Sequence, residues 1–296
     1  MTYWKKLCVR TKDYMLHMQV QITYLVIFFI ICLQNLQAQE IVDSVNIRAI
    51  YEFSYKTKEE QTIYSKFDLM YLDIGSKVTK FYSHYEYIRD SIGNNGLKRG
   101  LPPYEINELR RGYIRGTRTI YYNFLKNQQR IITSNWGFLY AYYNEPIFIP
   151  LWKFDNNTEE ILGYNCRKAS TYYLGREWIV YFTSEIPINQ GPWKLWGLPG
   201  LIVKANDKKN FFQYELKGLE NLEKRSPIIY VSKDYDEQSY IEMDKEAFRK
   251  LEKMYYENNR EFMQKFLGIQ NISISNPNGK KVEKSISLPY IPLEPW

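Results

Sequence analysis

Apolar and polar residues alternate along much of this chain. From Val45 to Tyr55 every second position is apolar, which places one side of the segment in a core and the other toward solvent. The same period returns within 67–83, 119–134 and 161–220, where glycine or polar residues separate the apolar runs. Short turns join antiparallel neighbours. The pattern therefore predicts a mainly β protein, an antiparallel meander that forms a curved sheet or an open barrel.

The apolar period lengthens near the C-terminus. Phe248, Tyr255 and Phe262 recur at helical spacing, which predicts one amphipathic helix over about 244–267. In the simplest interpretation, this helix packs on one face of the sheet. The alternative is that it binds a partner or a membrane surface. Proline and aromatic residues dominate 286–296, which predicts an extended tail.

Glycine, asparagine and proline gather between residues 90 and 112. Such residues favour turns and irregular structure. We therefore expect a long loop there, with one short helix near 104–109.

The first 38 residues have the order of a secretory signal peptide. A basic start precedes an uncharged apolar run over 22–33, and a polar stretch leads to Ala38. A membrane-spanning helix needs about 20 apolar residues, so this apolar run is short for one. An uncleaved N-terminal anchor helix is the alternative interpretation. We expect removal of 1–38, one β-rich domain over 39–296 with no integral membrane span, and a location in the periplasm or at the outer-membrane surface.

The charge of the chain does not indicate a nucleic-acid partner. The formal net charge is +7, and the excess of basic residues is spread along the sequence. Nucleic-acid binding needs basic residues gathered on one face, so we expect no nucleic acid. The densest basic group, Arg110, Arg111, Arg115 and Arg118, fits a solvated face, with an anion site as the alternative.

Residue types that bind metals or carry catalysis are scarce. Of 3 Cys and 2 His, only Cys166 and His84 lie beyond the expected signal peptide, which leaves no disulfide pair and no two-histidine metal site. We expect Cys166 to be a buried, inert thiol and His84 to be a surface or sheet residue. We predict no metal, no cofactor and no catalytic residues. Catalysis by a pair of carboxylates remains an alternative, because glycoside hydrolysis needs only two such groups. The candidate carboxylates are Glu145, Glu177 and Glu185.

The segment 191–202 concentrates glycine, proline and tryptophan. Glycine permits positive φ and proline fixes φ, so the backbone path is tightly constrained. In a structural interpretation, the segment is a crossover whose tryptophans fill the core. In a functional one, it lines the mouth of a site for an apolar or sugar ligand. The candidate ligand-binding residues are then Trp193, Trp196, Leu198 and Pro199.

A wider set of positions carries a resemblance to a known family. Its members are Gly163, Tyr164, Cys166, Lys168, Ala169, Gly175, Arg176, Trp178, Tyr181, Phe182, Thr183, Ile186, Pro187, Gly191, Pro192 and the run Gly197-Leu-Pro-Gly200-Leu-Ile202. Their order and spacing over 161–220 resemble the GLPGLI family of secreted bacterial proteins. The resemblance implies secretion and a β-rich fold, and it brings no catalytic residues to this chain. The structural members of the motif are Gly163, Tyr164, Cys166, Gly191, Pro192, Gly197 and Gly200.

These observations predict a non-enzymatic protein of the cell envelope that binds an apolar ligand or an outer-membrane partner. The expected shape is similar to half-barrel lipid carriers, an analogy of fold alone. Two alternatives stay open: a hydrolase that acts on glycans through paired carboxylates, and a structural or adhesive surface module. A carrier requires an apolar cavity, whereas a glycosidase requires two carboxylates about 5 to 10 Å apart in a cleft.

Overall fold

The computed structural model describes residues 41–136, 139–229, 240–267, 274–275, 281–282 and 287–296. The expected signal peptide, 1–38, lies outside the described residues, as does residue 286 at the start of the expected tail.

A sheet of twelve strands forms the body of the protein, in the order β12-β6-β5-β4-β3-β2-β1-β11-β10-β9-β8-β7. Every pairing is antiparallel except that of β12 with β6. The strands are β1 (Ile41–Tyr55), β2 (Lys66–Ile74), β3 (Val78–Ser83), β4 (Ile120–Phe124), β5 (Gln129–Trp136), β6 (Leu139–Pro146), β7 (Lys153–Ile161), β8 (Tyr164–Tyr173), β9 (Arg176–Thr183), β10 (Leu201–Asp207), β11 (Phe212–Ile229) and β12 (Ile241–Glu242).

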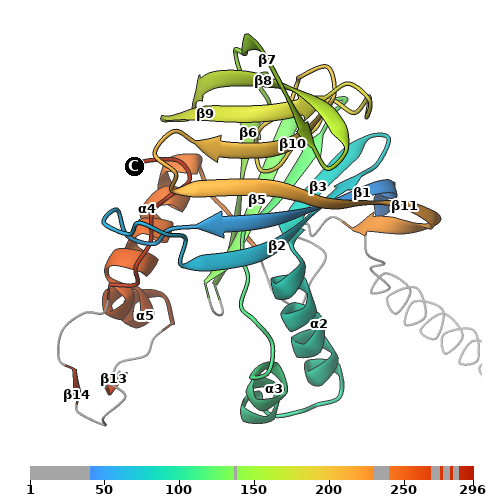
Figure 1. Ribbon diagram of the computed structural model, residues 1–296. Helices are drawn as coiled ribbons and strands as arrows, with labels where there is room; N and C mark the ends of the chain where they lie inside the picture. Colours follow the sequence, from blue (N-terminus) through green and yellow to red (C-terminus); the bar gives the residue numbers. More distant parts are fainter. Residues whose placement is uncertain (1–40, 137–138, 230–239, 268–273, 276–280, 283–286) are drawn as a thin grey trace, which may run out of the picture.

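The sheet is open and strongly curved. In the described residues β12 and β7 are its two edges and are not joined. In Figure 1, β5 and β6 pass behind β10 and β1, so the two halves of the sheet face each other across an interior. The prediction of a mainly β, antiparallel, open architecture is confirmed.

The core lies on one face of this sheet. Ala49, Tyr51 and Phe53 on β1 are buried and alternate with more exposed neighbours, as a two-residue period requires. α4 (Lys245–Glu257), α5 (Asn259–Leu267), the segment 184–200 and the tail contribute to the same apolar cluster. The Tyr51 hydroxyl donates to the carbonyl oxygen of Ile202 at 2.8 Å, which joins β1 to β10 across the core.

The predicted C-terminal helix is interrupted. Asp244 caps α4 by accepting a hydrogen bond from the N–H of Ala247 at 2.7 Å. Asn258 then leaves the helical conformation, with φ of −137° and ψ of 61°, and α5 begins at the next residue. The expected single helix over 244–267 is therefore two helices. A small separate pair, β13 (Ile274–Ser275) and β14 (Lys281–Val282), follows them.

A helical hairpin replaces most of the loop expected over 90–112. α2 (His84–Lys98) and α3 (Pro103–Arg110) project from the sheet below β2 in Figure 1, away from α4 and α5. A Cβ at Gly93 would lie 1.6 Å from a nitrogen of Arg110, and one at Gly96 would lie 2.7 Å from Ile106. These glycines permit two helices to approach closely, so the loop prediction was wrong for α2 because helix packing outweighs glycine's low helix propensity.

Candidate functional site

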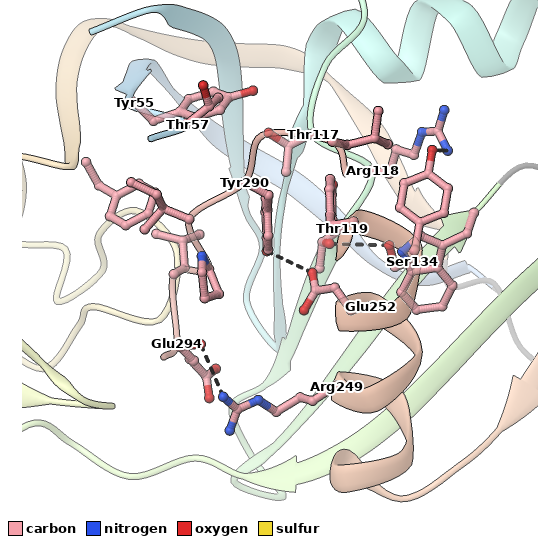
Figure 2. Close-up of a pocket in the computed structure, with 18 of the residues that line it drawn as sticks. Tyr55, Thr57, Thr117, Arg118, Thr119, Ser134, Arg249, Glu252, Tyr290 and Glu294 are labelled. Carbon is pink, nitrogen blue, oxygen red and sulfur yellow. Dashed lines mark hydrogen bonds between the residues drawn. The ribbon is translucent and has the colours of Figure 1, made fainter. Parts of the chain in front are cut away.

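A pocket lies between the curved sheet, α4 and the C-terminal tail, residues 287–296. Its volume is about 370 Å³. Strands of the sheet supply one wall, α4 and the tail supply the other, and the segment 115–119 lies at the rim. Figure 2 shows the tail beside α4, with the side chains of Tyr290 and Glu252 directed toward each other. Elements far apart in the sequence therefore build this site together.

Aromatic rings form much of the inner wall. Phe53 on β1 and Phe212 on β11 lie nearly parallel, with ring centroids 6.1 Å apart. Phe248 on α4 packs edge-on against Trp136, at 5.0 Å, and against Tyr143, at 4.8 Å. Rigid rings present a large apolar area at a small cost in side-chain entropy. The wall suits the apolar part of a ligand.

Two hydroxyl groups line the pocket. The hydroxyl of Thr119 donates to that of the buried Ser134 at 3.4 Å (Figure 2). Asp68 on β2 accepts hydrogen bonds from the N–H and the hydroxyl of Thr117, at 2.6 and 2.7 Å. These bonds hold the rim segment against the sheet.

The tail is held in place through its backbone. The guanidinium of Arg176 donates to the carbonyl oxygens of Leu293 at 2.8 Å and Pro292 at 2.6 Å. Arg249 on α4 donates to the carbonyl oxygen of Glu294 at 3.2 Å. An extended segment leaves its carbonyl oxygens without partners of its own, and the two arginines satisfy them. The tail is therefore a fixed wall of the pocket.

Burial alters the proton affinity of Glu252, on α4. The Tyr290 hydroxyl donates to its Oε1 at 3.0 Å, and the Tyr290 ring stacks on Tyr256 with centroids 3.7 Å apart. Desolvation raises the pKa of Glu252 from the ordinary 4.5 to about 7, although the bond from Tyr290 acts in the opposite direction. A large fraction of Glu252 is therefore uncharged at neutral pH and can donate a hydrogen bond to a ligand.

Two lysines and two glutamates form a ring of ion pairs beside the pocket. The ammonium of Lys194, which is 1% exposed, lies 2.6 Å from Glu145 and also contacts Glu294. The ammonium of Lys245 lies 2.8 Å from each of the two carboxylates. Burial alone would raise the pKa of Glu145, but Lys194 and Lys245 outweigh it and lower that pKa to about 2. Arg130 also contacts Glu145, at 3.3 Å, so three cations face the two carboxylates, and the cluster ties the tail to the segment 191–202.

One of the four candidate ligand-binding residues lines the pocket. Trp193 does so, and it is 2% exposed. Trp196, Leu198 and Pro199 are not among the lining residues. The ring N–H of Trp196 donates instead to the carbonyl oxygen of Phe148 at 3.1 Å, Leu198 is buried in the core, and Pro199 is exposed.

The structural members of the motif occupy the positions that glycine and proline favour. Gly163, Gly197 and Gly200 have φ of 79°, 86° and 149°, values that other residues rarely adopt. The remaining members divide by burial: Gly191, Pro192 and Cys166 are buried, and Tyr164 is half-buried.

The other chemical candidates from the sequence do not meet in the pocket. His84 is the first residue of α2 and does not line the pocket. Glu177 pairs with Lys208 at 2.8 Å near the surface, and Glu185 accepts a hydrogen bond from the N–H of Asn165. Glu145 belongs to the ion-pair ring. None of these three candidate carboxylates is among the residues that line the pocket.

Four charged residues in or beside the pocket were not predicted from the sequence, namely Lys194, Lys245, Glu252 and Glu294. Two of them left a signal. Lys194 and Glu294 stand within apolar, proline-rich segments, where a charge is costly unless it is paired. Glu252 left none, because an acidic residue on an amphipathic helix is ordinary.

Among the described residues, no group of three or more His, Cys, Asp or Glu is arranged to hold a metal ion. No helix in the described part of the chain has the length and the apolar character needed to cross a membrane.

Comparison with known proteins gives one short family match. Residues 175–204 match the model of a family described as "Protein of unknown function (Porph_ging)", and this segment contains the run Gly197-Leu-Pro-Gly200-Leu-Ile202. No curated protein matches the chain.

Among the solved structures that are similar to part of this chain are two of PNGF-II. "Structure of PNGF-II in P21 space group" has 15% identity and a TM-score of 0.46, over 71% of this chain and 33% of that chain. "Structure of PNGF-II in C2 space group" has 14% identity and a TM-score of 0.45, over 69% of this chain and 32% of that chain. This chain therefore spans about a third of the length of those solved chains.

Proposed function

We propose that this protein is a secreted, non-enzymatic protein of the cell envelope that binds a small, mainly apolar ligand in the pocket. The observation that carries the proposal is the pocket of about 370 Å³ between aromatic walls. Sites for small molecules are concave, largely apolar and about 300 to 1,000 Å³ in volume, with a few polar groups that orient the ligand. Glu252 and the hydroxyls of Thr119 and Ser134 supply such groups.

The carboxylates near the pocket favour binding over hydrolysis. Lys194 contacts Oε1 of Glu294 and Lys245 contacts Oε2, so both oxygens of this carboxylate are engaged. Glu145 is held in the same way by the two lysines. Of these three carboxyl groups, only that of Glu252 lies outside the ring of ion pairs. A glycosidase needs two available carboxyl groups, one as the acid and one as the second carboxylate.

Native mass spectrometry with lipid extraction tests the proposal, using residues 39–296 purified from the native envelope without detergent. We expect a stoichiometric apolar adduct. Ser134→Phe should abolish it, because the Ser134 side chain lines the pocket. Asn135→Phe is the matched control, since the next position on a strand faces the other side of the sheet. A clean apo mass, or an adduct that both variants retain, would overturn the proposal.

An exposed apolar run beside the motif supports a second candidate function, docking on an outer-membrane protein. Phe148, Ile149 and Leu151 each expose more than half of their surface, and Leu151 is 89% exposed. The ring N–H of Trp152 donates to the carbonyl oxygen of Trp196 at 2.9 Å, so the motif supports this run. Contiguous exposed apolar residues commonly mark interaction sites.

Site-specific photocrosslinking in intact cells tests this second candidate. A probe at Leu151 should form one discrete adduct with an outer-membrane protein. A probe at Tyr172, another highly exposed position, should not form that adduct. The absence of any adduct at Leu151, or the same adduct at both positions, counts against docking.

A further inference from the structure

Cationic side chains line one part of the pocket. Lys66 is the first residue of β2 and lies opposite Tyr55 on β1. Arg115 and Arg118 belong to the rim segment that Thr117 fixes to β2. From the sequence, the basic group around Arg115 could be either a solvated face or an anion site. Two of its members, Arg115 and Arg118, therefore reach the pocket.

Two of these cations have no anionic partner. Within the described residues, neither Lys66 nor Arg115 forms an ion pair with a carboxylate, and both are exposed. Arg118 is differently placed, because it donates to the hydroxyl of Tyr255 at 3.2 Å and lies 3.8 Å from Glu86. Lys66 and Arg115 are thus exposed cations that a ligand can still pair with, whereas Arg249, on the opposite wall, already donates to the carbonyl oxygen of Glu294 in the tail.

The acidic groups of the pocket leave this charge uncompensated. Glu294 is neutralised by Lys194 and Lys245. Glu252 is held against Tyr290 on the opposite wall, and burial keeps much of it uncharged at neutral pH by raising its pKa to about 7. Asp68 is buried and faces Ser83 and Thr117, with which it shares three hydrogen bonds.

We propose that the ligand is an amphipathic carboxylate with a single apolar chain, which lies against the aromatic wall while its carboxylate pairs with Lys66 and Arg115. The inference rests on the proposed function and names the ligand class. Arginine suits this role because its planar guanidinium can donate two parallel hydrogen bonds to one carboxylate. The aromatic wall of Phe53, Phe212 and Phe248 receives the chain.

The expected selectivity is modest, because the two cations are exposed to solvent. Each exposed ion pair strengthens binding by only about 1.4- to 5-fold. Two such pairs should make a carboxylate bind roughly 2- to 30-fold more tightly than the corresponding alcohol at low salt. The preference should shrink as the salt concentration rises, because surface charges are screened.

Binding of decanoate, 1-decanol and decyltrimethylammonium to residues 39–296 tests the proposal, measured by calorimetry and by tryptophan fluorescence. We expect decanoate to bind most tightly and the cationic amphiphile least. Acetate should not compete with decanoate, because it lacks the chain. Equal binding of decanoate and 1-decanol would overturn this inference and leave the proposed function standing. If none of the three amphiphiles bound, the proposed function would fall with it. Competition by acetate would show a free-anion site and also overturn the inference.

Matched variants locate the selectivity. The double variant Lys66→Gln, Arg115→Gln should bind decanoate and 1-decanol with nearly equal affinity. Arg111→Gln is the control, because Arg111 lies in the same loop but pairs with Glu108 at 3.1 Å and does not line the pocket. All of these side chains are exposed, so the fold should be retained, and circular dichroism checks this. An undiminished preference for decanoate in the double variant would overturn the proposal.

Discussion

The ammonium group of Lys194 contacts the carboxylate of Glu294, a hundred residues further along the chain. This contact joins the segment that resembles the GLPGLI family to the C-terminal tail. Lys245 on α4 completes the connection by contacting the same carboxylate at 2.8 Å. The segment 191–202, α4 and the tail therefore meet at one largely buried ring of charges, and this ring helps to fix the tail as a wall of the pocket.

Replacement of Lys194 with Met should strongly destabilise the protein. The change leaves Glu145 and Glu294 sharing Lys245 but without the more deeply buried Lys194. Loss of one partner from a buried ion pair costs about 3 to 5 kcal/mol, and we expect the lower end of this range because Lys245 remains. Urea denaturation measures the free energy of unfolding. Lys250→Met is the control, because Lys250 forms only a solvent-exposed pair with Glu246, and such pairs contribute little to stability. Equal losses in the two variants would show that the ring does not stabilise the fold.

Replacement of Arg176 with Lys should release the tail while the sheet stays folded. Lysine keeps the positive charge beside Asp207 but lacks the planar group that donates to the carbonyl oxygens of Leu293 and Pro292. We expect faster hydrogen exchange at residues 287–296 and faster digestion by carboxypeptidase. Arg167→Lys, at an exposed position on β8, is the matched control. Unchanged exchange of the tail in Arg176→Lys would contradict the proposed anchoring.

The alternation of apolar and polar residues predicted most of the sheet. Ala49, Tyr51 and Phe53 are buried on one face of β1, as the two-residue period requires. The motif segment was also readable, because glycine at positions such as Gly197 and Gly200 indicates backbone conformations that other residues rarely adopt. These features are predictable because each depends only on residues that are close together in the sequence.

Features that depend on contacts between distant residues could not be predicted. Gly93 breaks the helical pattern in the sequence, yet α2 forms because Arg110 of α3 packs closely against that glycine. The pocket itself requires the tail to meet α4, and Glu252 acquires its raised pKa only from the resulting burial. Among the candidate ligand-binding residues, Trp193 reaches the pocket and Pro199 does not, because their places depend on how the segment folds against the sheet.

Two glycines with positive φ should respond differently to alanine. A Cβ at Gly200 would lie 2.0 Å from the carbonyl oxygen of Thr183, whose strand pairs with β10 and cannot move aside. A Cβ at Gly163 meets nothing within 4 Å, so only its left-handed conformation is strained. We expect Gly200→Ala to lose more than about 3 kcal/mol and Gly163→Ala to lose about 1 to 2 kcal/mol. Thermal and urea denaturation measure both, and similar losses would contradict the steric argument.

Glu252 should make the protein less stable as the pH rises from 4.5 to 7. In this window the unfolded chain releases the proton of Glu252, because the ordinary pKa is 4.5, whereas burial keeps the folded protein protonated up to about pH 7. Folding therefore requires uptake of a proton, which becomes more costly with rising pH. Above pH 7 both states are ionised, and the penalty reaches its full value of roughly 3 kcal/mol at most.

The variant Glu252→Gln isolates this effect from other titrating groups. Glutamine has nearly the same shape, can still accept the hydrogen bond from Tyr290 and carries no charge at any pH. The difference in unfolding free energy between the variant and the parent protein should be small at pH 4, rise through pH 5 and 6, and become constant above pH 7. Urea denaturation at these pH values measures it. A difference that stays constant from pH 4 to pH 8 would show that Glu252 ionises normally in the folded protein.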